Sequence, residues 1–225
     1  MMLYRIWHKL TKTSRAAYLL ASLTALIFAY PVISDRPVAG FILVILFATT
    51  PVTGVYAISD RKRTTVIATA LAIPAILSIF GHFFFKSGLI SDGIFLGLIT
   101  IYYAFTTAAI IGHIFRKRKV DADTIISAVS AYLMIGLTFA VAFMLVQYRS
   151  GGAFSESTGD HIIGWHDMFY YSIVTLTTLG YGDISPTIPI SRSLATFEAV
   201  CGVMYMSILI AKLVSDYQSS RGTNG

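Results

Sequence analysis

The sequence has little charge and almost no cysteine. Of its 225 residues, 12% are charged, about half of the ~25% usual in soluble domains. Because 56% are hydrophobic, a soluble globule of this size would lack polar surface, so a membrane protein is indicated. The single cysteine, Cys201, excludes a disulfide framework within one chain and is expected to be a small core residue.

The net charge of +6 does not indicate a nucleic-acid partner. The cations occur in short clusters between apolar stretches, a pattern that sets membrane topology. Those predicted on the cytoplasmic side are Arg5, Lys9, Lys12, Arg15, Arg61, Lys62, Arg63, the Arg116–Lys119 cluster, Lys212 and Arg221. Only Arg36, Lys86, Arg149 and Arg192 fall on the other side. We therefore expect a multi-pass protein of the cell membrane with both termini cytoplasmic, in which the Arg116–Lys119 cluster contacts anionic lipid headgroups.

Six apolar stretches approach the ~20 residues that a helix needs to cross the hydrocarbon core. They are Ala16–Ile33, Val38–Ile58, Thr64–Phe80, Ile94–Phe115, Thr124–Tyr148 and Ser191–Val214. The third is short and contains Pro74, which predicts a kink or an extension into Gly81–Phe85. Upstream of the first, Leu3–Leu10 fits either an interfacial helix or a disordered basic tail. The predicted fold is an all-α membrane protein with six transmembrane helices.

The segment between the fifth and sixth stretches does not have the character of a span. Arg149–Gly164 is polar and glycine-rich, which predicts an external loop. Trp165–Thr177 is long enough for a short helix and too short to cross a bilayer. Gly180-Tyr181-Gly182 follows, and glycine permits backbone conformations that other residues avoid. Non-helical backbone at membrane depth is tolerated only where it is buried in protein or lines a water-filled cavity. We therefore predict a re-entrant pore loop.

Thr177-Thr178-Leu179-Gly180-Tyr181-Gly182-Asp183 resembles the filter signature of potassium channels, T-T-V-G-Y-G-D. The resemblance extends from about Thr124 to Tyr217. It implies a homotetrameric pore in which K⁺, as the permeant ion, is coordinated by backbone carbonyls and one hydroxyl. The coordinating residues it implies are Thr178 (carbonyl and hydroxyl), Leu179, Gly180 and Tyr181, and the supporting residues are Gly182, Asp183, Tyr170 and Tyr171. It also implies that the Tyr181 side chain packs near Tyr170 and Tyr171.

The domain organisation expected from these stretches has three parts. Residues 1–119 form a four-helix transmembrane domain, residues 120–217 form the pore domain, and residues 218–225 form a short cytoplasmic tail. The four helices occupy the position of a voltage sensor, yet Ile94–Phe115 contains no Arg or Lys. Since such charges supply the energy of voltage gating, we expect no voltage sensor of that kind here.

Several residues near the pore loop have two readings. Glu198, inside an apolar stretch, either modulates the filter or makes a structural hydrogen bond. Gly202 is either a gating hinge or a site of close helix packing. Asp183 either accepts a hydrogen bond from Tyr170 or only adds negative charge at the pore mouth. Two histidine–aspartate pairs, His161 with Asp160 and His166 with Asp167, fit solvated loop residues better than a divalent-ion site.

The sequence therefore predicts a potassium-selective channel that conducts passively. The alternative is a weakly selective cation channel of the same fold, because Leu179 replaces the usual valine and a tyrosine belt surrounds the filter. A membrane enzyme or transporter subunit is disfavoured, since no catalytic motif is present and the chain has one pore loop. We expect no catalytic residue and no cofactor.

Overall fold

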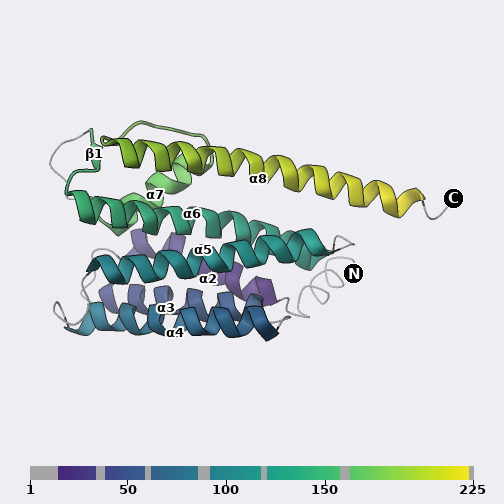
Figure 1. Ribbon diagram of the computed structural model, residues 1–225, viewed down its shortest axis with the longest axis horizontal. Coiled ribbons are helices and arrows are strands. Elements are labelled where there is room, and N and C mark those ends of the chain that lie inside the picture. The colour runs from purple at the N-terminus through teal and green to yellow at the C-terminus, as the bar shows by residue number, and fades with distance from the viewer. Residues whose placement is uncertain are drawn as a thin grey trace.

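The computed structural model describes residues 15–33, 39–58, 62–85, 92–117, 121–157 and 163–222. The elements are, in order, α2 (Arg15–Ile33), α3 (Ala39–Ala57), α4 (Lys62–Phe85), α5 (Asp92–Arg116), α6 (Ala122–Ser150), β1 (Phe154–Glu156), α7 (Trp165–Leu176), β2 (Ile184–Pro186) and α8 (Pro189–Gly222). Figure 1 shows the long helices side by side. The predictions for Leu3–Leu10, Asp160, His161, Arg118 and Lys119 fall outside the described residues.

Each of the six predicted apolar stretches coincides with a long helix. The third, α4, continues through Gly81–Phe85, so the predicted extension is confirmed. Within the described residues, three helical segments are long and apolar enough to cross a bilayer: Gly93–Arg116, Ala122–Ser150 and Pro189–Asp216. Two shorter apolar helices cover Arg15–Phe28 and Val44–Ala57. The protein is thus a mostly helical membrane protein.

Helices α2 to α5 pack together around two buried tyrosines, Tyr102 and Tyr103. Their hydroxyls reach the proline turn of α3. Pro51 has no N–H, so the Phe47 carbonyl loses its usual helical donor. The Thr50 hydroxyl donates to that carbonyl instead (2.8 Å) and lies 2.7 Å from the Tyr103 hydroxyl. A hydrogen-bonded network thus joins α5 to the interrupted turn of α3.

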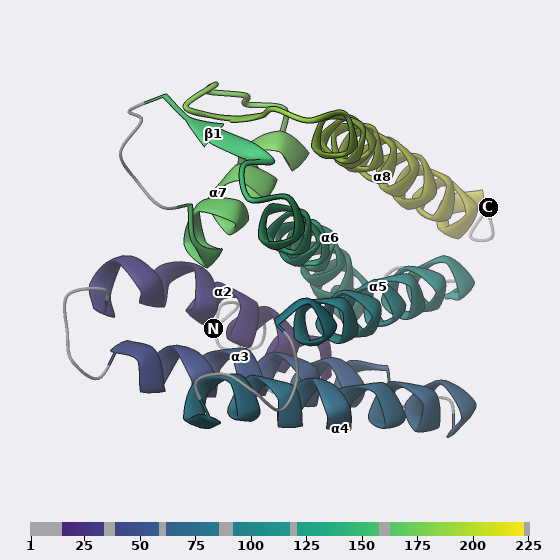
Figure 2. The ribbon, with the colours of Figure 1, turned by 60° about the vertical axis from the view of Figure 1, so that its left-hand side comes forward.

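Helix α7 lies in the angle between α6 and α8, as Figure 2 shows. Helix α6 begins at Asp121, whose carboxylate accepts from the Thr124 N–H (2.8 Å). It ends at Gly151, where a φ of 51° favours glycine. Helices α2 to α5, the four-helix group, also contact α7. The rings of Phe47 in α3 and Trp165 in α7 meet edge to face, with centroids 4.6 Å apart.

Three features differ from the sequence prediction. The segment after α6 is not wholly an external loop, because β1 pairs antiparallel with β2 and Phe154 is buried. Helix α8 runs to Gly222, so residues 218–222 of the predicted tail continue the helix. No proline interrupts α8 after its first residue, and an ion pair between Lys212 and Asp216 (3.0 Å) supports its last turns. Cys201 is partly exposed in the protomer, so the core position predicted for it is wrong for one chain.

Candidate functional site: the pore loop

The predicted pore loop begins with the short helix α7, which has the predicted position and length. Its twelve residues extend about 18 Å, well short of the ~30 Å hydrocarbon core. At its start, the Asp167 carboxylate accepts from the Gly164 N–H (2.7 Å). At its end, the Thr177 N–H and hydroxyl both donate to the Ile173 carbonyl, at 3.0 and 2.7 Å. Both ends of the helix are therefore fixed by local hydrogen bonds.

The C-terminus of α7 fits into a notch between α6 and α8. The Leu176 carbonyl accepts from the Tyr132 hydroxyl of α6 (3.1 Å). On the other side lies Gly202 of α8, where an added Cβ would stand 2.3 Å from the Leu176 oxygen. Real Cβ atoms do not approach an oxygen so closely, so this position requires glycine. The contact supports the packing reading of Gly202, and a hinge role stays a prediction.

The backbone after α7 alternates in handedness. Thr178, Gly180 and Gly182 have φ angles of 62°, 58° and 79°, whereas Leu179 and Tyr181 do not have positive φ. Positive φ is uncommon for threonine, so Thr178 is held in a strained conformation. The Leu179 N–H donates to the Val174 carbonyl (2.9 Å), which ties the start of this segment to α7. A segment that alternates in this way is neither helix nor strand.

The side chains of this segment are not buried within one chain. Leu179 is 58% exposed and Tyr181 is 67% exposed. The packing of Tyr181 near Tyr170 and Tyr171 therefore stays a prediction. Tyr171 behaves differently, because it is buried and its ring lies 5.2 Å from both Phe143 and Phe154.

Asp183 makes the predicted hydrogen bond at the end of the segment. The Tyr170 hydroxyl donates to Asp183 Oδ2 (2.7 Å), while Oδ1 accepts from the Ile184 N–H (3.0 Å). The hydrogen bond from Tyr170 lowers the pKa of Asp183, and the same bond raises the pKa of Tyr170 to about 12. Of the two readings for Asp183, the hydrogen-bonded one is confirmed.

A clamp that sequence reasoning missed holds the residues that follow Asp183. The Asp183 carbonyl accepts from the Ser157 N–H (2.8 Å), and β2 pairs with β1 from Ile184 onward. Phe154 of β1 packs against both Phe143 and Tyr171, with ring centroids 5.3 and 5.2 Å away. The available signal was Phe154 itself, a lone aromatic in a polar, glycine-rich stretch.

Glu198 lies behind α7 and is fully buried. Its Oε1 is hydrogen-bonded to the Ser172 hydroxyl, which also lies 2.7 Å from the Gly136 carbonyl of α6. Its Oε2 has no partner among the described residues. The predicted structural hydrogen bond is therefore present and links all three helices of this region, while a modulatory role stays a prediction.

The histidine and aspartate at the start of α7 are in direct contact. His166 Nε2 lies 3.1 Å from Asp167 Oδ1. No three His, Cys, Asp or Glu side chains lie together as a metal site in the part of the chain that the structure describes.

Comparison with known proteins agrees with the geometry of this region. Residues 131–219 match the ion channel family Ion_trans_2. The chain is 36% identical over 86 residues to two pore potassium channel c of Oryza sativa subsp. japonica. It is 30% identical over 83 residues to potassium voltage-gated channel subfamily A member 10 of Mus musculus. The pore region of this chain is related to the potassium channel superfamily.

The extent of these matches differs between relatives. The two potassium channels are matched over 38% and 36% of this chain, which spans only 17% and 16% of their lengths. Protein LctB of Bacillus caldotenax is 29% identical over 103 residues, which are 44% of this chain and 76% of that protein. No solved structure matches the chain significantly. The relationship therefore concerns the channel region, α6 to α8.

Proposed function

We propose that the protein is a potassium-selective channel that conducts K⁺ passively, without catalysis and without a cofactor. The observation that carries this proposal is the alternation of positive φ at Thr178, Gly180 and Gly182, directly after a helix too short to span. In a β-strand, successive carbonyls point to opposite sides. Alternating the sign of φ turns successive peptide planes so that their carbonyls align along one edge. We call this row of carbonyls the conduction edge, and it can replace the water shell of an ion.

The proposed ligands are the carbonyl oxygens of Thr178, Leu179, Gly180 and Tyr181, with the Thr178 hydroxyl. Gly182, Asp183, Tyr170 and Tyr171 would hold this edge in place. The Tyr170–Asp183 hydrogen bond and the buried Tyr171 support that assignment. The C-terminus of α7, which carries partial negative charge, precedes the edge and would favour a cation there.

One chain contributes one such edge, so we propose that four copies surround the conduction axis. The exposed face of α8 supports assembly, because only 22% of its apolar window is buried in the protomer, against 56% for α6. Large apolar side chains exposed there are Phe197, Val200, Val203, Met204, Met206, Ile208, Ile210 and Val214. The exposed Leu179 and Tyr181 would then pack against neighbouring copies.

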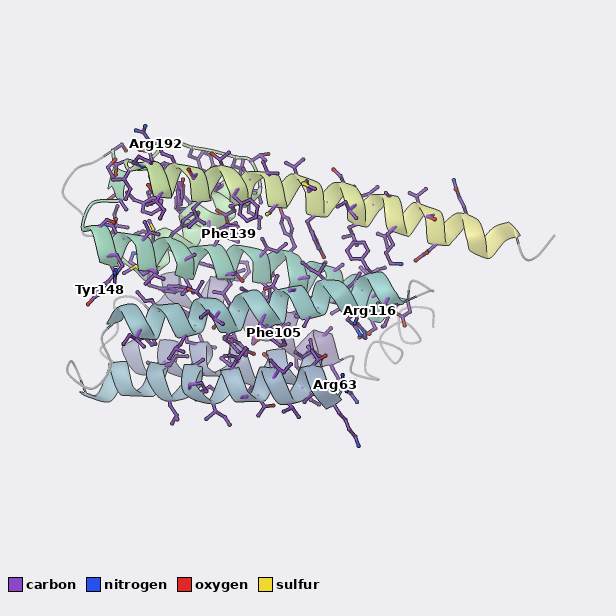
Figure 3. All side chains as sticks on the ribbon, in the orientation of Figure 1. Arg63, Phe105, Arg116, Phe139, Tyr148 and Arg192 are labelled. Atoms are coloured by element: carbon purple, nitrogen blue, oxygen red, sulfur yellow. The ribbon has the colours of Figure 1, made fainter. Side chains whose placement is uncertain are left out.

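The proposed topology has six spans with both termini cytoplasmic in the cell membrane. Figure 3 shows Arg63 and Arg116 at one end of the helices, with Tyr148 and Arg192 at the other. The end with Arg63 and Arg116 is the one predicted to face the cytoplasm, because the basic clusters concentrate there.

Ion flux from purified protein in liposomes tests this function. We expect K⁺ flux far above Na⁺ flux, and loss of K⁺ flux in Gly180→Asp, because a φ of 58° is strained for a residue with a side chain. A particle mass corresponding to four chains is expected in solution. Equal Na⁺ and K⁺ flux would refute selectivity, and a monomeric particle would refute the pore.

A weakly selective cation channel of the same fold is the second candidate. It is favoured by Leu179, which stands where the filter signature usually has valine, since the larger side chain would shift the backbone whose carbonyls face the ion. Reversal potentials with K⁺ on one side and Na⁺ on the other separate the two candidates. A potential near zero selects the weakly selective channel.

A further inference from the structure

A cavity between α4 and α5 has a basic mouth and an apolar floor. Its volume is about 590 Å³, within the ~300–1,000 Å³ range of small-molecule sites. Ile67, Phe105, Ala109 and Gly112 form much of the floor, and Arg63 and Arg116 stand at the end where α4 begins and α5 ends. The cavity is separate from the pore loop, which lies on α6 to α8.

Two cations at this mouth are available for a ligand. Lys117 also lines the cavity, but its ammonium is bound to Asp123 (2.6 Å). Within the described part of the chain, neither Arg63 nor Arg116 has a hydrogen-bond or ion-pair partner, and both are exposed. Guanidinium groups bind phosphate through paired N–H donors, so an unpaired couple of this kind suits a phosphate group.

The depth of the floor fits one leaflet. From Phe105 to Arg116, α5 advances eleven residues, or about 16 Å. Half of the hydrocarbon core is ~15 Å thick. A molecule with its anionic group at Arg116 would therefore need an apolar chain reaching the middle of the bilayer. Free phosphate would leave this apolar floor unused.

We propose that this cavity binds one anionic phospholipid of the cytoplasmic leaflet, with its phosphate between Arg63 and Arg116 and an acyl chain along the floor beneath Gly112. The site lies in the four-helix group and does not depend on which ion the pore conducts. It would fix the lateral position of α4 against α5 at the membrane surface.

Charge variants test the headgroup contact. The full-length protein is equilibrated with phosphatidylglycerol or phosphatidylcholine, and bound lipid is counted by native mass spectrometry. We expect preferential retention of phosphatidylglycerol, weakened roughly tenfold or more in the double variant Arg63→Gln, Arg116→Gln. The single variant Arg63→Gln has Lys62→Gln as its matched control, because each removes one charge from the same exposed turn and only Arg63 lines the cavity. An equal loss in Lys62→Gln would overturn the site in favour of diffuse surface attraction.

Filling the floor tests the acyl-chain contact independently. A Cβ added at Gly112 meets nothing within 4 Å, so Gly112→Leu should fold and occupy the floor. Gly97 of the same helix is equally open but lies outside the cavity, so Gly97→Leu is the control. We expect loss of the retained lipid in Gly112→Leu only. Unchanged retention in that variant, or full displacement of the lipid by inorganic phosphate, would overturn the proposal.

Discussion

At the scale of single residues, Gly202 and Leu176 set the fit between α7 and α8. The notch at Gly202 has no space for a methyl group beside the Leu176 carbonyl. Overpacking of this kind costs about 1–3 kcal/mol. We therefore expect Gly202→Ala to lower the thermal unfolding temperature of the purified protein and to weaken its assembly.

Gly97→Ala is the matched control for that substitution, because an added Cβ there meets nothing within 4 Å. It should leave the unfolding temperature unchanged or raise it slightly, since alanine favours the helix. If Gly202→Ala unfolds at the wild-type temperature and changes only channel opening, Gly202 is a hinge and the packing account is wrong.

The Tyr170–Asp183 hydrogen bond is the second residue-scale feature with a direct test. Tyr170→Phe removes the donor, and we expect K⁺ currents that decline faster during sustained opening, because the end of the conduction edge loses a tether. Asp183→Asn keeps an acceptor and should have the smaller effect. Combining both substitutions should add little to Tyr170→Phe alone, and fully additive effects in single-channel recordings would contradict the pairing.

At the scale of elements, the N-terminus of α6 is sensitive to pH through Asp121. Burial alone would raise the pKa of Asp121, but hydrogen bonds from Thr124 and the charge of Lys117 outweigh burial and lower the pKa. The stabilisation is therefore present above the ordinary pKa of aspartate, near ~4, and is lost as the pH falls through the lowered value. We expect the unfolding temperature of the wild type to drop in that acidic range.

Asp121→Asn separates the cap from its titration. Asparagine caps helices about as well as aspartate but does not titrate here, so this variant should lose less stability on acidification. Asp121→Ala should cost about 1 kcal/mol at neutral pH. Identical acid profiles for the wild type and Asp121→Asn, measured by circular dichroism, would contradict this role.

The elements differ in how well the sequence predicts them. Apolar run length located all six long helices, and the short run at Trp165–Leu176 located α7, because membrane burial imposes a strong length constraint. The strand pair was missed, since Phe154–Glu156 and Ile184–Pro186 are each three residues long and lie far apart in sequence. The end of α8 was also missed, because polarity after Val214 indicates where the membrane ends and does not stop a helix.

Some contacts of the candidate site could be predicted from the sequence, and others could not. The filter motif and the Tyr170–Asp183 pairing were predictable from the resemblance, which fixes their spacing. The contact of Glu198 with Ser172 depends on the rotation of α8 against α7, which no sequence spacing specifies. The burial of Tyr181 depends on surfaces that one chain does not supply.

At the scale of the whole molecule, the four-helix group lacks the charges of a voltage sensor. Helix α5 has basic residues only in its last turn, at His113 and Arg116. Moving one charge through the field is worth about 2.3 kcal/mol per 100 mV. We therefore expect an open probability that varies weakly with voltage, including across resting potentials of about −40 to −90 mV. Planar-bilayer recordings with steep activation, equivalent to several charges per channel, would contradict this expectation.

The edge-to-face contact of Phe47 with Trp165 joins that group to the first turn of α7. A displacement of α3 would therefore reach the N-terminal turn of α7, at the opposite end of that helix from Thr178, without any charge crossing the membrane. In the proposed channel, this ring contact would be a direct path by which a displacement of α3 reaches the pore helix.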